Sequence, residues 1–132
     1  MKYCLPRFVI IIILISLTSS IPAEIRRYDG TGAVEIHVRT IVKPNHALPL
    51  QKTFREHFFP AISKQKGFLH CDLLRATTSK NAYVLTIAFK TEQLRVTWAN
   101  SPLHQKVWPK MQEHFKQESI AIDVFGLVSP QL

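Results

Sequence analysis

The sequence predicts an α+β domain whose strands and helices follow one another in the order β-α-β-β-α-β. Two kinds of periodicity support this fold class. Apolar residues alternate with polar ones over residues 34–39, which is the pattern of a strand with two unlike faces. Between residues 48 and 64 apolar residues recur every four positions instead, which gathers them on one side of a helix. The remaining segments repeat these two patterns.

The first strand starts near Ala33 and ends at Ile41-Val42, because the segment 43–46 (Lys-Pro-Asn-His) breaks the alternation. Pro49 suits the first turn of the helix that follows, and Pro60 predicts a kink or a tighter turn near Phe59. Gly67 is a stop signal after this helix. The apolar stripe of the helix consists of Leu50, Phe54, Phe58 and Ile62.

Two further strands are expected at residues 68–74 and 83–89, and the polar stretch 77–81 between them indicates a hairpin. Residues 91–117 return to a helical rhythm, broken at Ser101-Pro102 because proline restricts the residue before it. The last strand is expected within residues 120–128 and is ended by Ser129-Pro130.

This element order is that of ferredoxin-like domains, in which both helices cover one face of a four-stranded antiparallel sheet. The other face is left bare. We expect apolar groups on that face too, among them Leu73, Leu85 and Phe125. A second copy of the same sheet is the simplest way to cover it, so the sequence predicts a homodimer that pairs through its sheet faces.

The first 23 residues have the three parts of a secretory signal peptide. Lys2 and Arg7 form a basic start, residues 8–17 are almost wholly aliphatic, and Ala23 offers a small residue at the cleavage point, with Ser20 as a second possible site. The apolar run is about half the length of a permanent membrane span, which takes about 20 residues. We therefore expect an exported protein, periplasmic or secreted, that contacts the membrane only transiently. A flexible lead over 24–32 and one domain over 33–129 complete the organisation.

Charge and cysteine content narrow the function classes. The whole chain carries a formal charge of +8, and removal of residues 1–23 leaves 15 Lys and Arg against 9 Asp and Glu, or +6. Most basic residues are dispersed, without the aromatic interleaving of a nucleic-acid site, so no nucleic-acid partner is expected. Cys71 would be the one cysteine of the mature chain, typical of a core position. No close His/Cys/carboxylate spacing indicates a metal site, and no phosphate loop indicates a nucleotide cofactor.

Four passages resemble the antibiotic biosynthesis monooxygenase family of dimeric α+β barrel proteins, over roughly residues 33–129. They are Thr40 to Pro44 at the end of the first strand, Gly67-Phe68, Leu73-Leu74-Arg75, and above all the segment from Trp98 to His104. The resemblance implies a sheet-to-sheet dimer and, in each subunit, a ligand cavity between the sheet and the helices. Family members oxidise aromatic polyketides or quinols without a bound cofactor, degrade haem, or act on small signalling molecules.

The resemblance also implies site residues. Trp98 matches a tryptophan that presses on the porphyrin in the haem-degrading branch, although an aromatic residue on a helix facing a sheet is also an ordinary core residue. The axial histidine of that branch lies ten positions later, where this chain has Trp108. Aligning the first strand places His37 where the branch has an asparagine. We take His37, Trp98 and His104 as candidate catalytic residues, since a histidine is suited to accept a proton near neutral pH.

Strand parity extends this set with polar side chains. Glu35, His37 and Arg39 share one face of the first strand, and His70 and Asp72 share one face of the second. If the two faces coincide, Arg39 is suited to hold an anionic substrate and Asp72 to orient a histidine. Salt bridges at the dimer interface are the alternative. The candidate substrate-binding residues are Arg39, His70, Asp72 and Asn100.

The expected function is therefore that of an exported monooxygenase-like protein, which oxidises a small aromatic or quinol-type molecule without a cofactor. The alternative is a non-catalytic binding module whose cavity holds a hydrophobic small molecule or haem.

Overall fold

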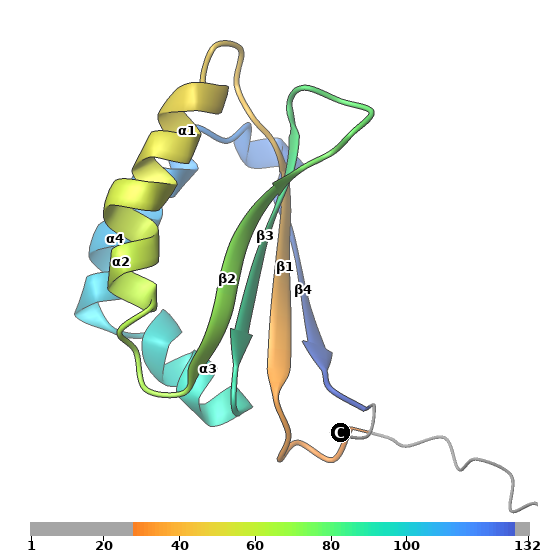
Figure 1. The fold of residues 1–132 in the computed structure, drawn as a ribbon, viewed down its shortest axis with the longest axis vertical. Coiled ribbons are helices and arrows are strands. Elements are labelled where there is room, and N and C mark those ends of the chain that lie inside the picture. The colour runs from red at the N-terminus through yellow and green to blue at the C-terminus, as the bar shows by residue number, and fades with distance from the viewer. Residues whose placement is uncertain (1–27, 129–132) are drawn as a thin grey trace, which may run out of the picture.

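A computed structural model describes residues 28–128, and the predicted signal segment lies outside them. The elements follow the expected order, with each helical region divided (Figure 1). The strands are β1 (Val34–Ile41), β2 (Phe68–Arg75), β3 (Ala82–Phe89) and β4 (Ala121–Gly126). The helices are α1 (Ala47–Thr53), the π-helical turn η1 (Phe54–Phe58), α2 (Phe59–Ile62), α3 (Glu92–Ala99), α4 (Pro102–Gln112) and the 3-10 turn η2 (Gln117–Ser119).

The four strands form one antiparallel sheet in the order β2-β3-β1-β4. β1 lies in the interior, with Ile36 paired to Ile87 of β3 on one side and to Val124 of β4 on the other. The chain returns across the sheet after each helical region, so β2 and β4 become the two edges. All helices lie on one side of the sheet, as Figure 1 shows, which confirms the predicted ferredoxin-like fold.

The core lies between the sheet and these helices. From β1 it takes Val34, Ile36 and Val38, and from the helices Leu50, Phe58 and Met111. Cys71 belongs to the same core, and burial raises the pKa of its thiol to about 12, with a smaller contribution from the charge of Asp72. This agrees with the core position expected for it.

One expectation about the bare face is wrong. Leu73 and Leu85 pair with each other in register with Val38, so both point toward the helices rather than away from them. Phe125 does lie on the bare face, in the row of His70, Ala88 and Glu35. Other apolar residues of that face include Ile41, Leu74, Val84 and Ala88.

The first helical run continues from Ala47 to Ile62, but its middle turn is π-helical. The kink or tighter turn predicted near Phe59 is not found: the turn before it is wider, and Pro60 lacks the N–H that a regular helix would use there. The Phe59 N–H instead bonds to the Phe54 carbonyl, five residues back. The run remains continuous, and Leu50, Phe58 and Ile62 of the predicted stripe are fully buried.

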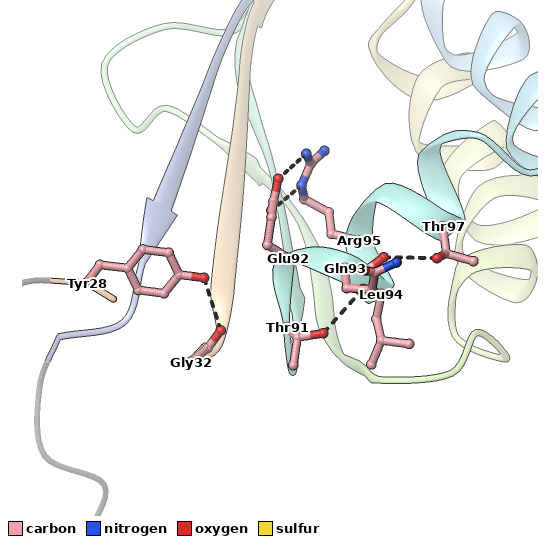
Figure 2. Close-up of polar contacts among 8 residues, drawn as sticks. All are labelled: Tyr28, Gly32, Thr91, Glu92, Gln93, Leu94, Arg95 and Thr97. Atoms are coloured by element: carbon pink, nitrogen blue, oxygen red, sulfur yellow. Dashed lines mark hydrogen bonds and ion pairs between the residues drawn. The ribbon is translucent and has the colours of Figure 1, made fainter. Parts of the chain in front are cut away.

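The second helical region breaks at the predicted point. Thr91 caps α3 by accepting a hydrogen bond from the Leu94 N–H at 3.3 Å (Figure 2), and Ser101 caps α4 by accepting one from the His104 N–H at 3.1 Å. The turn between α2 and β2 uses Gly67 at φ +78°, beneath the side chain of Leu94.

The described part of the predicted lead packs against the end of the sheet. The Tyr28 hydroxyl donates to the Gly32 carbonyl at 3.2 Å (Figure 2), and the Tyr28 ring lies directly over Gly126 of β4. The two ends of the described chain therefore lie together at this edge of the sheet. Within residues 28–128, no helix has the length and apolar character needed to cross a membrane.

Candidate functional site

A cavity of about 180 Å³ lies on the helix-covered side of the sheet, between helices α3 and α4 and strands β1 and β4. Most of its lining consists of apolar side chains from the strands and the helices. Its polar side chains, Arg95 and His104, both belong to the second helical region. The lining residues are Ile36, Val38, Phe58, Ile87, Arg95, Trp98, Ala99, His104, Trp108 and Ile122. The helices stop short of β4, so Ile122 remains 57% exposed and the cavity is open on that side.

His104 lies between two tryptophans in this cavity. Its ring stacks on Trp108 with centroids 5.9 Å apart and an interplanar angle of 14°. The ring of Trp98 meets it edge to face at 5.2 Å and 88°. Phe58 contacts both tryptophans from the opposite helix, at 6.2 Å and 6.0 Å. The four rings form one aromatic cluster, which holds the imidazole in a defined orientation.

Local sequence explains this arrangement. His104 and Trp108 are four residues apart on α4 and therefore share one face of that helix. Pro102 occupies the first turn and Ser101 caps it, so α4 begins at a defined residue just before His104. Trp98 lies in the last turn of α3, and the break at residues 100–101 turns the two helices so that their aromatic residues meet.

Burial lowers the pKa of His104 below the ordinary value of a histidine. Because desolvation disfavours the charged form, the site favours the neutral imidazole, in which one ring nitrogen is able to accept a proton. A neutral, half-buried histidine in an aromatic cavity is the kind of group that acts as a general base.

Arg95 is the second polar group of the cavity. Its Nε donates to a carboxylate oxygen of Glu92 at 2.7 Å, and its second guanidinium nitrogen contacts the other oxygen (Figure 2). This bidentate pair within the first turns of α3 lowers the pKa of Glu92 through the hydrogen bond from Arg95. The pair fixes the guanidinium at the rim of the cavity.

His37 does not reach this cavity. It points to the bare face of the sheet, where its Nε2 lies 2.8 Å from a carboxylate oxygen of Glu35 and its ring lies 4.9 Å from that of Phe125. The neighbouring Ile36 and Val38 line the cavity instead. The expectation that His37, Trp98 and His104 meet in one site is thus wrong for the protomer, because strand residues alternate between faces.

The predicted polar face does form, on the side away from the cavity. His70 of β2 lies 3.6 Å from Glu35 and 3.4 Å from Asp72, and His37 continues the row. Arg39 donates to Asp123 of β4 at 2.7 Å, on the same face. We call Glu35, His37, Arg39, His70, Asp72 and Asp123 the polar ladder. Its members pair with one another, so the alternative of structural salt bridges on the bare face describes them better than a substrate site in the protomer.

Asn100 also lies apart from the cavity. It ends α3 as an exposed residue and is absent from the cavity lining. Arg95 was not identified as a site residue from the sequence. Trp108 was considered only as the residue found in place of an axial histidine. Helical spacing was the available signal, since Arg95 and Trp98 are three residues apart and His104 and Trp108 four.

No group of three or more His, Cys, Asp or Glu side chains gathers in a metal-binding arrangement within residues 28–128. His104 is the one histidine among the cavity-lining residues, and Trp108 lies beside it on α4.

Several solved structures resemble this chain, all at low sequence identity. A candidate antibiotic biosynthesis monooxygenase from Caulobacter crescentus superposes with a TM-score of 0.67 at 15% identity, over 76% of this chain and 93% of that chain. SnoaB, a cofactor-independent oxygenase from Streptomyces nogalater, superposes with 0.65 at 15% identity, over 75% and 96%. A similar protein from Nitrosomonas europaea gives 0.66 at 15% identity, over 79% and 97%.

No protein-family model matches the sequence, and no curated protein matches it significantly. At such identities the solved structures establish the architecture and leave the chemistry to the site itself. The order of elements, the single helical layer and the strand order of residues 28–128 give this chain the ferredoxin-like fold of the antibiotic biosynthesis monooxygenase structures.

Proposed function

We propose that this protein oxidises a small aromatic or quinol-type molecule with molecular oxygen and without a bound cofactor. The observation that carries the proposal is the neutral imidazole of His104, held between Trp98 and Trp108 in an open aromatic cavity. The fold is also that of SnoaB, which is described as a cofactor-independent oxygenase. Fold alone would not support the reaction, so the proposal depends on the cavity.

The proposed reaction begins with proton transfer to His104. An activated methylene between aryl groups, as in an anthrone, loses a proton to the imidazole, and the resulting carbanion passes one electron to oxygen. The radical pair then forms a carbon–oxygen bond, the peroxide takes the proton back, and loss of water leaves a carbonyl. In sum, one methylene group and one molecule of oxygen give one carbonyl group and one molecule of water. A simple quinol instead gives the quinone and hydrogen peroxide.

The other lining residues have distinct proposed roles. Trp98 and Trp108 offer ring faces and edges to a planar substrate. We propose that the guanidinium of Arg95, fixed by Glu92, stabilises the negative charge that the carbanion shares with a substrate oxygen. We therefore propose His104 as the general base and Arg95 as the oxyanion-stabilising group, and His37 no longer belongs to the proposed catalytic set.

Oxygen consumption by the purified protein tests this proposal. A panel of benzoquinols, naphthoquinols and anthrones is offered under isotopically labelled oxygen gas, and products are analysed by mass spectrometry. One labelled oxygen atom is expected in the carbonyl made from an anthrone. His104→Gln should lower kcat by roughly 100-fold or more, as loss of a general base does. His57→Gln, which changes an exposed histidine outside the cavity, is the matched control. The proposal fails if no member of the panel is altered or if both variants behave alike.

A non-catalytic binding module remains the second candidate, because eight of the ten cavity-lining residues carry no ionisable group. Such a module would hold a hydrophobic small molecule, or haem, without converting it. Native mass spectrometry and a visible absorption spectrum of the purified protein separate the two functions. A bound ligand that is recovered unchanged under oxygen supports binding, whereas product formation supports oxidation.

We also propose that the protein works as a homodimer paired through the bare face. Several apolar residues remain on that face between the charged pairs, among them Leu74 and Phe125, each 50% exposed. Sedimentation of Phe125→Lys should yield a monomer, whereas Leu48→Lys on the helical side should leave the dimer intact. A wild-type protein that sediments as a monomer at micromolar concentration would refute the pairing.

Export is the last part of the proposal and rests on the signal-peptide pattern of residues 1–23. Amino-terminal sequencing of the protein recovered outside the cytoplasm is expected to begin at Glu24, after cleavage behind Ala23. Recovery of the full-length chain in the cytoplasm alone would contradict it.

A further inference from the structure

A second cleft, of about 400 Å³, opens between the first helical run and the hairpin end of strands β2 and β3. Its lining combines two arginines with an amide, a phenol and two apolar side chains: Gln51, Phe54, Arg55, Leu73, Arg75 and Tyr83. It shares no lining residue with the His104 cavity. Any ligand bound here would therefore occupy a different place from the proposed substrate.

The helical side of the cleft is built from one face of the first run. Gln51, Phe54 and Arg55 are three and four residues apart, so they project in one direction. The π-helical turn begins at Phe54 and widens the helix at this point, and such turns occur frequently at functional sites. Phe54 is half-buried and gives the cleft an apolar wall.

The strand side contributes a hydrogen-bonding floor. Leu73 and Arg75 of β2 point toward the helices, and Arg75 is paired in register with Tyr83 of β3. The Tyr83 ring is buried, and its hydroxyl accepts a hydrogen bond from the Gln51 amide at 3.3 Å. Because the hydroxyl acts as acceptor there, its own hydrogen is available to donate toward the cleft.

The charge of the cleft is positive and uncompensated. No Asp or Glu is among its lining residues, and neither Arg55 nor Arg75 forms an ion pair with any residue of the described range 28–128. The other two arginines of that range, Arg39 and Arg95, both have carboxylate partners. A guanidinium without a partner presents donors that match a carboxylate or a phosphate.

We propose that this cleft is a second ligand site, specific for a small organic anion with an aromatic or aliphatic body. The anionic group, a carboxylate or a phosphate monoester, binds between Arg55 and Arg75 and accepts the Tyr83 hydroxyl hydrogen. The body of the ligand packs on Phe54 and Leu73. This site does not depend on the proposed oxidation, because it lies outside the His104 cavity.

Titration of the isotope-labelled protein with phenyl phosphate and, separately, benzoate tests the proposal by NMR. Saturable shifts are expected in the arginine Nε–H signals of Arg55 and Arg75 and in the amides around Gln51 and Tyr83. Benzyl alcohol, which has the ring without the charge, should produce no saturable shift at these residues. The anion that binds with the higher affinity shows whether the site prefers a phosphate or a carboxylate.

The double variant Arg55→Gln/Arg75→Gln should weaken binding by about a hundredfold, since each of the two lost charge-assisted bonds is worth roughly a factor of ten. Lys64→Gln/Lys66→Gln removes the same charge from positions outside the cleft and should leave affinity within about twofold. Tyr83→Phe should weaken binding without changing the charge. Equal losses in the two double variants, or shifts that never saturate, would overturn the proposal and indicate attraction by net charge alone.

Discussion

The two faces of the sheet share their strands but differ in almost every other respect. On the covered face, alternate residues of β1 are buried apolar side chains that meet the helices, and the aromatic cavity lies among them. On the bare face, the intervening residues form the polar ladder, whose members pair with each other. Two groups adjacent in sequence therefore belong to separate environments, since the sheet backbone lies between them.

The covered face is itself divided. Helical residues seal most of it, and Phe58, Phe89 and Phe115 are fully buried there. The helices do not extend over β4, where Ile122 and Val124 point to the same side but stay 57% and 49% exposed. The His104 cavity lies at this boundary. Incomplete covering, rather than a hole in the core, is therefore what gives a ligand access to the aromatic cluster.

The largest expected difference is in the free energy of unfolding when a phenylalanine on each face is replaced by alanine. Phe58→Ala should lower the free energy of unfolding by about 3–5 kcal/mol, because it leaves a cavity in a close-packed core. Phe125→Ala on the bare face should cost less than about 1 kcal/mol in the monomer. Denaturant unfolding at low protein concentration measures both. Similar losses in the two variants would contradict the distinction between the faces.

The next largest loss of stability is expected in the turn between α2 and β2, where Gly67 lies beneath α3. Gly67→Ala places a methyl group 2.3 Å from the Leu94 side chain at a backbone φ of +78°. The left-handed backbone costs about 1–2 kcal/mol, and the overlap adds about 1–3 kcal/mol. Gly30→Ala has φ +86° with nothing within 4 Å, so only the backbone cost is expected. Thermal unfolding compares them, and an equal shift in Tm would show that Leu94 simply moves aside.

The loss of folding stability at acidic pH should come from histidines on the helix-covered side of the sheet. Burial lowers the pKa of His104, and burial followed by the nearby His46 lowers the pKa of His114. The unfolded chain then binds more protons than the folded one, so stability should be constant above about pH 6.5 and fall as the pH drops below it. NMR titration should place the pKa of His104 below the ordinary histidine value. His104→Phe keeps an aromatic ring without the titration, and an equally steep decline in that variant would argue against this origin.

The smallest effect belongs to the polar ladder. Glu35→Gln removes the carboxylate that contacts both His37 and His70, yet these side chains are more than one-third exposed. Exposed ion pairs contribute little, so we expect a change below about 1 kcal/mol that diminishes further at high salt. Asp72→Asn is a matched change at the edge of the ladder. A loss of several kcal/mol in the monomer would mean that the ladder stabilises the fold.

Much of the fold could be predicted because its signals are local. The alternation around Val34, the four-residue rhythm from Leu50 to Ile62 and the break at Ser101-Pro102 each depend on neighbouring residues. Pro60 predicts a kink or a tighter turn near Phe59, whereas the structure has a wider π-helical turn, since the form of the turn depends on how the helix packs. The covered cavity was expected between sheet and helices, and Trp98 and His104 do meet there.

By itself, the sequence determined the order of the elements, the breaks between them and which residues of β1 share a face. Only the tertiary structure decided which of the two faces meets the helices. That choice separates His37 from Trp98, brings Arg95 into the cavity of His104, and places Arg55 and Arg75 in the lining of one cleft. The physical reason is that strand alternation has two equivalent phases until the helices bury one of them, and residues distant in sequence meet only after that burial.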